Sequence, residues 1–497
     1  MDTKKNVIKL LNSYNFEAWF CGGTARDIYI GKEPLNYDIA VQATLTELRD
    51  KLATRITTIN EYGTFITVDF KDTIFYIYPL KKIELVNTYY NFAFTNSLYE
   101  DSSTRDFTIN SLYYNPLTGI WVDNHNGKKD IQNKCIKFVG DGITRILESK
   151  VRLLRAAALA TTLGESWYID ISSINAIKSE KLKLLTVNSK QINKEITKVF
   201  LYSKNPSKFF YLLKELELLK DFFPELYNCI NVEQTNKNNN LNLFQHIMLA
   251  LDAVPNSLNK DKLLLLRVAA LLHDIGKPYT KTYDNGNMHF YQHEYVGAYI
   301  AEKILYRWGF DKHFINQVLN LITNHLFDAN PNRALSSIKK LIYKVGTSNI
   351  HDLIELRAAD RKGNHRVMDM TQLNKFSKKV NRILEQESPD DFILDVDVNK
   401  LKELLTPLTS RLDITLEALQ KHLRMLITIK KLQNKQTKIL TYTKNLLSIK
   451  CPLDVVFLIK TWSEIYKDTA DKFQNGNLKC GIYCNFTCNT ILNKNGP

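Results

Sequence analysis

The sequence predicts a mixed β-sheet with a few helices, an α+β unit, at the start of a chain that is otherwise helical. Between residues 16 and 140, short apolar, β-branched and aromatic runs alternate with turn residues, as in strands. From residue 143 almost to the end, apolar residues recur at the spacing of helices. A chain of 497 residues is also too long for a single core, so we expect several domains.

The elements expected in the α+β unit follow one another closely. Residues 1–20 predict a short amphipathic helix that leads into the first strand. The strand candidates are EAWFCGG, YDIAV, GTFITVDF, TIFYIYPL, FTINSLYYNP, GIWVDN and CIKFVG, which begin at residues 17, 37, 63, 73, 107, 119 and 135. In the helical part, the asparagine-rich stretch of residues 231–244 is the best linker candidate.

Composition and charge limit the function classes. No apolar stretch is long enough to cross a bilayer, and the N-terminus lacks the apolar segment of a signal peptide, so we expect a cytoplasmic protein without a membrane partner. The net charge of +15 and the pI near 9.2 favour a polyanionic partner such as nucleic acid. A lysine-rich surface that is merely solvated would give the same charge.

Seven cysteines, an odd number, argue against a disulfide framework in such a chain. Cys480, Cys484 and Cys488 are spaced by four residues and would share one face of a helix. Three thiolates could bind a metal if a fourth ligand came from elsewhere. We prefer a small apolar helix face, because no CxxC pair or nearby histidine supports a metal.

A glycine pair, Gly22 and Gly23, stands between a predicted strand and a predicted helix. Such a pair lets backbone N–H groups approach phosphate oxygens, and Arg26 beside it could add positive charge. Asp38 follows in the next strand, with Asn36 two positions earlier on the same strand face. A glycine pair alone is a common turn, but its distance to Asp38 and to the later stretch TRDFTIN makes the pattern more specific.

These stretches resemble the bacterial class II tRNA nucleotidyltransferases, or CCA-adding enzymes, and the related poly(A) polymerases. That family has the motifs GGxVRDxxLGxxxxDxDIA, RRDFTINA and EDxxRxLRAxRFA in this order. The matching residues that the resemblance assigns to nucleotide or RNA binding are Gly22, Gly23, Arg26, Asp27, Arg105, Asp106, Asn110, Arg152 and Arg155. The stretch FFYLLKELELLKDFFPEL also resembles the helical neck of the family.

The chain departs from this family where the family binds metal. In the family, two aspartates of a DxD motif hold two magnesium ions that activate the RNA 3′ hydroxyl and clamp the nucleoside triphosphate. Here the first aspartate is replaced by Asn36, and a third carboxylate position falls on Tyr76. Positions of the family's base-selection motifs differ as well, namely Thr104, Ser149, Lys190 and Gln191. The sequence therefore predicts an impaired nucleotidyl-transfer site in which catalytic Asp38 remains.

Two other functions stay open for this part of the chain. One is an active CCA-adding or poly(A)-adding enzyme that uses Mg²⁺ with ATP or CTP, with Asp38, Asp106 or Asp27 and a water shell replacing the missing ligands. The other is a non-catalytic tRNA-binding protein, because phosphate contacts survive the loss of catalytic acids.

A second pattern occupies the helical part, where nine of the ten histidines lie between residues 246 and 422. Adjacent residues on a helix diverge by about 100°, so the histidine and aspartate of LLHDIGK can reach one ion only where the helix ends or is distorted. One buried histidine on a helix is ordinarily a core residue. Here, however, six residues follow one another in the order H…HD…H…H…D, namely His246, His273, Asp274, His293, His325 and Asp360.

This order resembles the HD-domain metal phosphohydrolases that many CCA-adding enzymes carry on their C-terminal side. The resemblance implies a first metal on His246, His273, Asp274 and Asp360, and a second on His293 and His325 with Asp274 bridging. Imidazoles with carboxylates suit Mn²⁺, Ni²⁺, Fe²⁺, Co²⁺ or Zn²⁺ better than Mg²⁺. Such ions activate water for attack on phosphorus. Lys277 could contact a substrate phosphate, although a surface lysine is an equally good interpretation.

The sequence thus predicts a nucleotidyltransferase-like α+β head, an all-α neck, an all-α HD domain and a helical tail. Their expected ranges are residues 1–142, 143–235, 236–380 and 381–450, followed by a cysteine-containing extension at 451–497. The expected partners are nucleotides and the 3′ end of tRNA or another RNA. The HD domain is expected to hydrolyse a phosphomonoester or a 2′,3′-cyclic phosphate.

Overall fold

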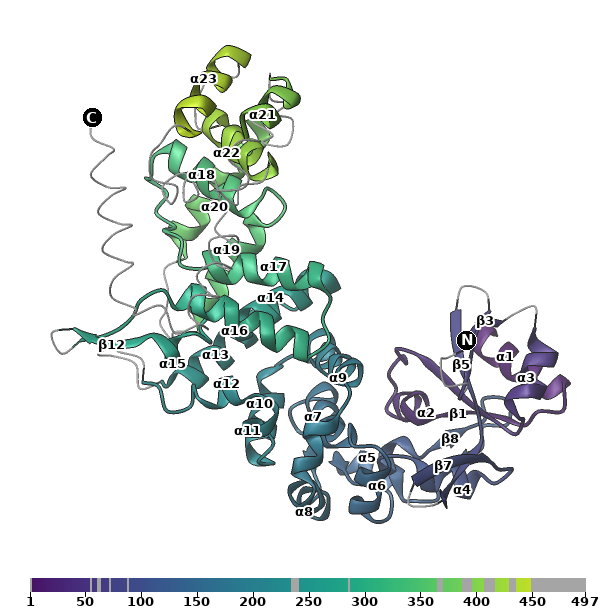
Figure 1. Ribbon diagram of the computed structural model, residues 1–497. Helices are drawn as coiled ribbons and strands as arrows, with labels where there is room; N and C mark the ends of the chain where they lie inside the picture. Colours follow the sequence, from purple (N-terminus) through teal and green to yellow (C-terminus); the bar gives the residue numbers. More distant parts are fainter. Residues whose placement is uncertain are drawn as a thin grey trace. The chain divides into compact units, whose positions relative to one another are not determined.

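The computed structural model describes residues 2–53, 56–59, 64–70, 73–86, 89–233, 241–284, 287–363, 370–386, 396–405, 416–428 and 435–447. The chain divides into two compact units, Met1–Phe223 and Pro224–Pro497 (Figure 1). The cysteine cluster at Cys480, Cys484 and Cys488 lies outside the described residues, as does the middle of the asparagine-rich stretch. Among the helices that are described, none is long and apolar enough to span a membrane.

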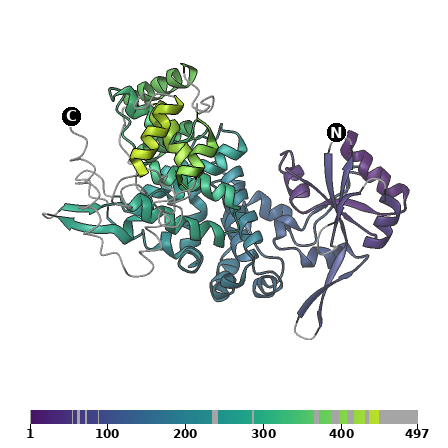
Figure 2. The same ribbon diagram turned by 45° about the horizontal axis from the view of Figure 1, so that its top comes forward.

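The first unit contains the predicted mixed sheet, which is confirmed. Seven strands lie in the order β3-β4-β5-β2-β1-β8-β9, with β2 and β5 parallel and the other neighbours antiparallel. They are β1 (Ala18–Cys21), β2 (Tyr37–Val41), β3 (Ile56–Ile59), β4 (Ile66–Phe70), β5 (Thr73–Pro79), β8 (Tyr113–Tyr114) and β9 (Trp121–Val122). A separate antiparallel hairpin, β6 (Lys81–Val86) and β7 (Tyr89–Phe94), projects from this unit and was not among the predicted strands (Figure 2).

Alternation along the strands decides which side chains face a potential site. Helices α1 (Asp2–Ser13) and α3 (Leu45–Leu52) cover one face of the sheet and share its core with Phe20 and Ile39. The opposite face buries Trp19 and Ala40. Because side chains alternate along a strand, Asp38 points to this second face, away from α1 and α3.

One predicted strand is wrong in part. The residues FTIN follow α4 (Leu98–Thr104) and form a short 3-10 helix, η1 (Thr108–Asn110), so only the pair Tyr113–Tyr114 from that stretch joins the sheet. Thr108 explains the difference, because its hydroxyl donates to Asp130 while its carbonyl accepts from the Ser111 hydroxyl. Such local hydrogen bonds compete with strand pairing.

Helices make up most of the remainder of the first unit. They are α2 (Gly22–Tyr29), α5 (Gly127–Gln132), α6 (Gly142–Glu148), α7 (Arg152–Leu163), α8 (Ile171–Ser179), η2 (Lys181–Thr186), α9 (Ser189–Tyr202), α10 (Ser207–Glu215) and α11 (Leu219–Phe222). Helix α7 packs against α9 and α10. Two short strands, β10 (Cys135–Ile136) and β11 (Tyr168–Ile169), form a parallel pair. Because β11 follows α7, the neck expected at residues 143–235 is not purely helical.

The second unit is mostly helical. Its helices are α12 (Pro224–Tyr227), α13 (Leu243–Asp252), α14 (Lys260–Leu272), α15 (Lys277–Thr280), α16 (His293–Arg307), α17 (Lys312–Asn324), α18 (Leu335–Val345), α19 (Ile350–Lys362), α20 (Thr371–Gln386), α21 (Val398–Leu405), α22 (Leu416–Thr428) and α23 (Gln436–Leu447). Helix α14 is central, and α13, α16, α17 and α19 pack around it. Its residues from Leu265 to Leu272 are all buried, which explains why this helix is apolar on every side.

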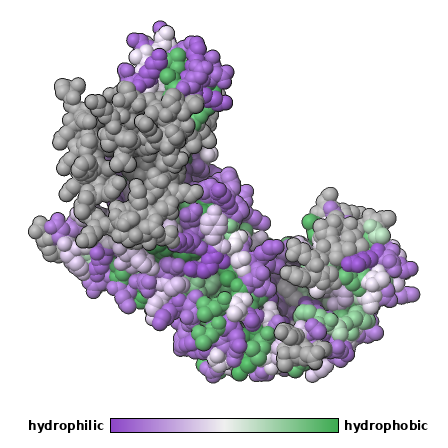
Figure 3. Space-filling model, viewed as in Figure 1, coloured by the Kyte–Doolittle hydropathy of each residue, from purple (hydrophilic) through white to green (hydrophobic). Residues whose placement is uncertain are grey.

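The second unit also contains an antiparallel hairpin, β12 (Lys281–Asp284) and β13 (Asn287–Phe290), so the expectation of an all-α region is corrected here. All residues of β12 are exposed. Because neither face of this strand is buried, its sequence lacks the alternation of apolar and polar residues that predicts a strand. The Asn-Gly pair at 285–286 is the sequence signal that could have indicated a hairpin. The visible described surface in Figure 3 is largely hydrophilic, with small apolar patches.

Candidate functional site

The ends of helices bring the histidine and aspartate side chains together in the second unit. Helix α14 ends at Leu272, so His273 is its C-cap and Asp274 lies in the turn beyond it. Adjacent His273 and Asp274 can therefore both face one site, as the sequence analysis required of a helix end. His293 is the first residue of α16, and His325 is the C-cap of α17. His246 and Asp360 extend from α13 and α19.

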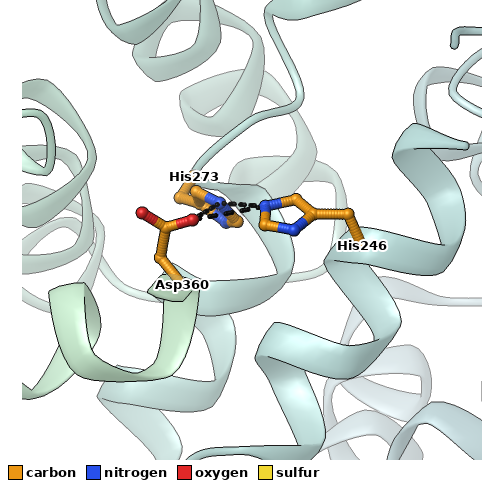
Figure 4. Close-up of side chains that lie close together, drawn as sticks. All are labelled: His246, His273 and Asp360. Carbon is orange, nitrogen blue, oxygen red and sulfur yellow. Dashed lines mark hydrogen bonds and ion pairs between the residues drawn. The ribbon is translucent and has the colours of Figure 1, made fainter. Parts of the chain in front are cut away.

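A first group consists of His246, His273 and Asp360 (Figure 4). The Nε2 atoms of the two imidazoles lie 3.2 Å apart. The Asp360 Oδ1 atom is 3.3 Å from Nε2 of His246 and 3.5 Å from Nε2 of His273. Three ligand atoms from three different helices therefore converge on one buried point.

A second group consists of Asp274, His293 and His325, and Asp274 links it to the first. The Oδ1 atom of Asp274 lies 3.1 Å from Nε2 of His293 and 3.6 Å from Nε2 of His325. Its Oδ2 atom lies 3.2 Å from Nε2 of both His246 and His273. Each oxygen of this single carboxylate faces a different group, which is the arrangement of a bridging ligand.

Backbone carbonyls orient all four imidazoles. The Nδ1 atoms of His246, His273, His293 and His325 face the carbonyl oxygens of Gly363, Ala270, Phe290 and Ile322 at 3.2, 2.8, 2.7 and 2.7 Å. A carbonyl can only accept, so each neutral ring carries its proton on Nδ1 and turns the Nε2 lone pair inward. Lone pairs that face carboxylate oxygens need a cation or protons between them. The donor set therefore fits one or two divalent transition metals.

The electrostatics of the protein without metal point the same way. Burial would lower the pKa of His273, but the carboxylates of Asp274 and Asp360 raise it to about 10. Burial would raise the pKa of Asp274, yet the charges of His273 and Lys277 hold it well below its usual range. His273 thus keeps a proton when no cation is bound, and a bound cation would displace that proton.

The turn that carries Asp274 depends on Gly276. A Cβ atom there would lie 2.3 Å from the carbonyl oxygen of His293 and 2.5 Å from the backbone nitrogen of Gly297. The turn after α14 can therefore reach the start of α16 only with glycine at this position.

Gly276→Ala should lower the stability of the second unit by about 1–3 kcal/mol, because the backbones must separate to admit a methyl group. Calorimetry of the full chain measures this as a lower unfolding temperature. Gly23→Ala is the control, since its nearest neighbour would lie at an ordinary 3.6 Å. Equal unfolding temperatures for the two variants would contradict the packing argument.

Two cations contact the carboxylates of the cluster. The Lys277 ammonium donates to Asp274 Oδ2 at 2.6 Å, so the predicted phosphate-contacting lysine lies on the bridging carboxylate. Arg357, which the sequence analysis missed, donates from Nη1 to Asp360 Oδ2 at 2.7 Å and leaves Oδ1 facing the imidazoles. Its position three residues before Asp360 on the same helix is the signal that could have indicated it.

Arg357→Met should weaken divalent metal binding about 10–100-fold, because the Asp360 carboxylate loses the partner that fixes its orientation. Competition with a chelator of known affinity measures this. Arg357→Lys should restore part of the loss, and Arg361→Met on the same helix serves as the control. Unchanged affinity in Arg357→Met would show that the helix alone orients Asp360.

In the first unit, the structure places the residues of the glycine-pair motif close together. Gly22 begins α2 with φ +61°, a conformation that favours glycine. Arg26 donates to Asp27 Oδ1 at 2.7 Å and to Asn110 Oδ1 at 2.7 Å, and it is only 8% exposed. The motif residues Arg26, Asp27 and Asn110 therefore form one partly buried network beside the glycine pair.

The remaining arginines predicted to bind nucleotide or RNA are held by acidic residues. Arg105 pairs with Asp101 at 2.7 Å. Arg152 pairs with Glu148 at 2.7 Å and also donates to the carbonyl oxygen of Thr104. Arg155 joins Asp106 and Glu195, each at 3.0 Å. These groups organise the contact between head and helices, so their charges are largely satisfied within the protein.

Asp38 lies among cations and tyrosines. The register of β2 and β5 pairs Asp38 with Tyr76, so the position expected for a third carboxylate is adjacent to it and carries a phenol. Burial raises the pKa of Asp38, while Arg105, Lys194, the Tyr78 hydroxyl and Lys198 oppose that shift. Asn36 precedes β2 and is exposed. Within the described ranges, groups of three potential ligands occur at the histidine cluster and not at Asp38.

Models of two protein families match the two parts of the chain that contain these residues. The model of the poly A polymerase head domain matches residues 18–137, and that of the HD domain matches residues 241–386. The chain thus carries a poly A polymerase head domain and an HD domain, and its relatives include CCA-adding enzymes and poly(A) polymerases. It is 29% identical over 220 residues to the CCA-adding enzyme of Ligilactobacillus salivarius, which covers 43% of this chain and 52% of that one. It is 31% identical over 179 residues to poly(A) polymerase I of Escherichia coli O157:H7, which covers 33% and 38%.

The chain thus spans about half the length of the curated family members it matches, or less. Similarity in fold covers a larger share of the chain than similarity in sequence. The crystal structure of the Bacillus stearothermophilus CCA-adding enzyme in complex with CTP superimposes with a TM-score of 0.53, at 16% identity, over 89% of this chain and 96% of that one. A CCA-adding enzyme in complex with ATP gives 0.52 at 14% identity, over 90% and 94%. At this identity the family fold is shared, and catalytic competence is a separate question.

Proposed function

We propose that the protein acts at the 3′ ends of tRNA or another RNA and that its HD domain is a metal-dependent phosphohydrolase. The substrate would be a phosphomonoester or a 2′,3′-cyclic phosphate. The convergence of four imidazoles and two carboxylates in two groups that share Asp274 carries this proposal. The basic charge of +15 and the relationship to tRNA-modifying enzymes support RNA as the partner.

The roles of the residues follow from their contacts. His246, His273 and Asp360 would hold one ion, His293 and His325 a second, and Asp274 would bridge them. A divalent ion bound there lowers the pKa of water toward neutrality and neutralises charge on phosphorus. Mn²⁺, Ni²⁺, Fe²⁺, Co²⁺ or Zn²⁺ suit these donors. The Lys277 ammonium donates a hydrogen bond to Asp274. If Asp274 bound an ion instead, this ammonium would be available to contact a phosphate oxygen.

We further propose that the head holds RNA with an impaired nucleotidyl-transfer site. The absence of acid at Asn36 and Tyr76 leaves Asp38 as a single carboxylate among Arg105, Lys194 and Lys198. Two magnesium ions carry a charge that a single carboxylate balances poorly. The surroundings of Asp38 therefore favour phosphate over metal.

Purified protein incubated with tRNA that lacks its terminal CCA, Mg²⁺ and labelled ATP or CTP should incorporate no label. Asp38→Ala should consequently leave this assay unchanged. The second candidate function, an active CCA-adding or poly(A)-adding enzyme, is favoured by the match of the head domain to that family. Incorporation that Asp38→Ala abolishes would establish that candidate and overturn the impaired head.

A further inference from the structure

The hairpin of β12 and β13 lies in the chain between two proposed metal ligands, Asp274 and His293, and projects from the helices of the second unit (Figure 2). Its second strand ends at Phe290, whose carbonyl oxygen faces Nδ1 of His293 at 2.7 Å. Its first strand follows the short helix that begins with Lys277, which donates to Asp274 at 2.6 Å. Both ends of the hairpin are therefore fixed beside the metal groups.

One face of this hairpin alternates aromatic rings and cations. The register pairs Lys281 with Phe290 and Tyr283 with Met288, so these four side chains share a face. The Lys281 ammonium lies 5.3 Å from the ring centre of Tyr283, and the Lys277 ammonium lies 5.6 Å from that of Phe290. Tyr283, Lys281, Phe290 and Lys277 thus form a track of alternating rings and cations that leads toward the metal groups.

The track is most accessible at the end that lies farthest from the metal groups. Tyr283 is 68% exposed, and Lys281 beside it is exposed as well, whereas Phe290 and Lys277 are partly buried. Exposed rings and cations in alternation can hold the bases and phosphates of a single strand of nucleic acid. A duplex keeps its bases stacked inside the helix, so rings on a hairpin can reach only unpaired nucleotides.

We propose that the track binds unpaired nucleotides of an RNA strand, with bases on Tyr283 and Phe290 and phosphates at Lys281 and Lys277. The inference rests on the proposed function for RNA as the partner, and it assigns the surface that holds the strand next to the metal groups. Stacking on an aromatic ring accepts any base, so the track selects single strands and not a particular sequence.

The test measures how tightly the full-length protein binds a fluorescently labelled uridine homopolymer and, separately, a blunt RNA duplex. Tyr283→Ala should weaken binding of the homopolymer about tenfold, whereas Tyr283→Phe, which keeps the ring, should not. Binding of the duplex should be the same in all variants. Tyr291→Ala is the matched control, because Tyr291 is 55% exposed but stacks on His289, which the register places on the opposite face of the hairpin.

A second variant tests the phosphate contact. Lys281→Met should lower the slope of log Kd against log salt for the homopolymer by about 0.7, the value for one phosphate contact on a single strand. An unchanged slope would overturn the role of Lys281 in the track.

The outcomes separate this inference from the proposed function. Unchanged affinity of Tyr283→Ala for the homopolymer overturns the inference and leaves a protein as the fitting partner for the exposed ring. Equal losses in Tyr283→Ala and Tyr291→Ala overturn it as well, because binding would not be confined to one face. If the wild type binds tRNA but not the homopolymer, only the inference fails, and if it binds neither, the RNA partner of the proposed function fails too. A tenfold loss confined to Tyr283→Ala supports the track even in a protein that hydrolyses no phosphate ester.

Discussion

Replacing both His273 and Asp274 by alanine should abolish divalent metal binding and the proposed phosphohydrolase activity together. These residues contribute to both groups, since Asp274 alone faces all four imidazoles at 3.1 to 3.6 Å. Loss of such ligands leaves too few donors to hold either ion. Elemental analysis of the desalted protein should show metal content falling to background, and hydrolysis of phosphate esters should fall with it.

RNA affinity should change by no more than a few fold in this variant, because RNA contacts are expected through phosphates elsewhere on the basic chain. His313→Ala is the matched control: it removes an exposed imidazole from the same unit and should leave metal and activity intact. Wild-type metal content in the double variant would contradict the assignment of the cluster, whatever the activity.

Arg155→Ala should destabilise the first unit by about 3–5 kcal/mol, because it leaves two buried carboxylates without their shared cation. The guanidinium group lies 3.0 Å from both Asp106 and Glu195, whose side chains are 12% and 2% exposed. Calorimetry or denaturant unfolding of the full chain measures the loss. In the native protein, the Arg155 side chain connects α7 with Asp106 of the head. Its loss should therefore destabilise the whole of the first unit.

The pH dependence gives this prediction its sign. Burial would raise the pKa of Asp106, but Arg155 and Arg152 hold it at about 2, below its ordinary 3.8. The stabilisation is therefore complete above pH 3.8 and is lost as the pH falls toward 2. The difference between wild type and Arg155→Ala should shrink over this interval. A difference that is constant with pH would mean that lost packing, and not the ion pair, is responsible.

Lys181→Ala provides the comparison in the same unit. Its ammonium pairs with Glu217 at 2.7 Å, but the two side chains are 36% and 51% exposed. An exposed pair of this kind contributes less than about 1 kcal/mol. Equal destabilisation by Lys181→Ala and Arg155→Ala would contradict the assigned role of burial.

Local patterns predicted much of the fold because they depend on neighbours in the chain. The alternation in YDIAV placed β2 and the side of Asp38, and the apolar run before His273 predicted α14 and its end. The pattern failed where tertiary contacts compete with it. The composition of FTIN predicts a strand, but Thr108 bonds to Asp130 and Ser111 and the segment forms a 3-10 turn. Strand β12 is exposed, so its sequence has no apolar alternation.

The sequence by itself determined the chemistry available to this protein: imidazoles and carboxylates in the order of an HD domain, and neutral residues at Asn36 and Tyr76. The chemistry of a side chain follows from its residue type, which the sequence gives directly. Only the tertiary structure decided that Asp274 divides its oxygens between two groups and that Arg357 holds Asp360. Those relations join residues far apart in the chain, and helix packing sets them.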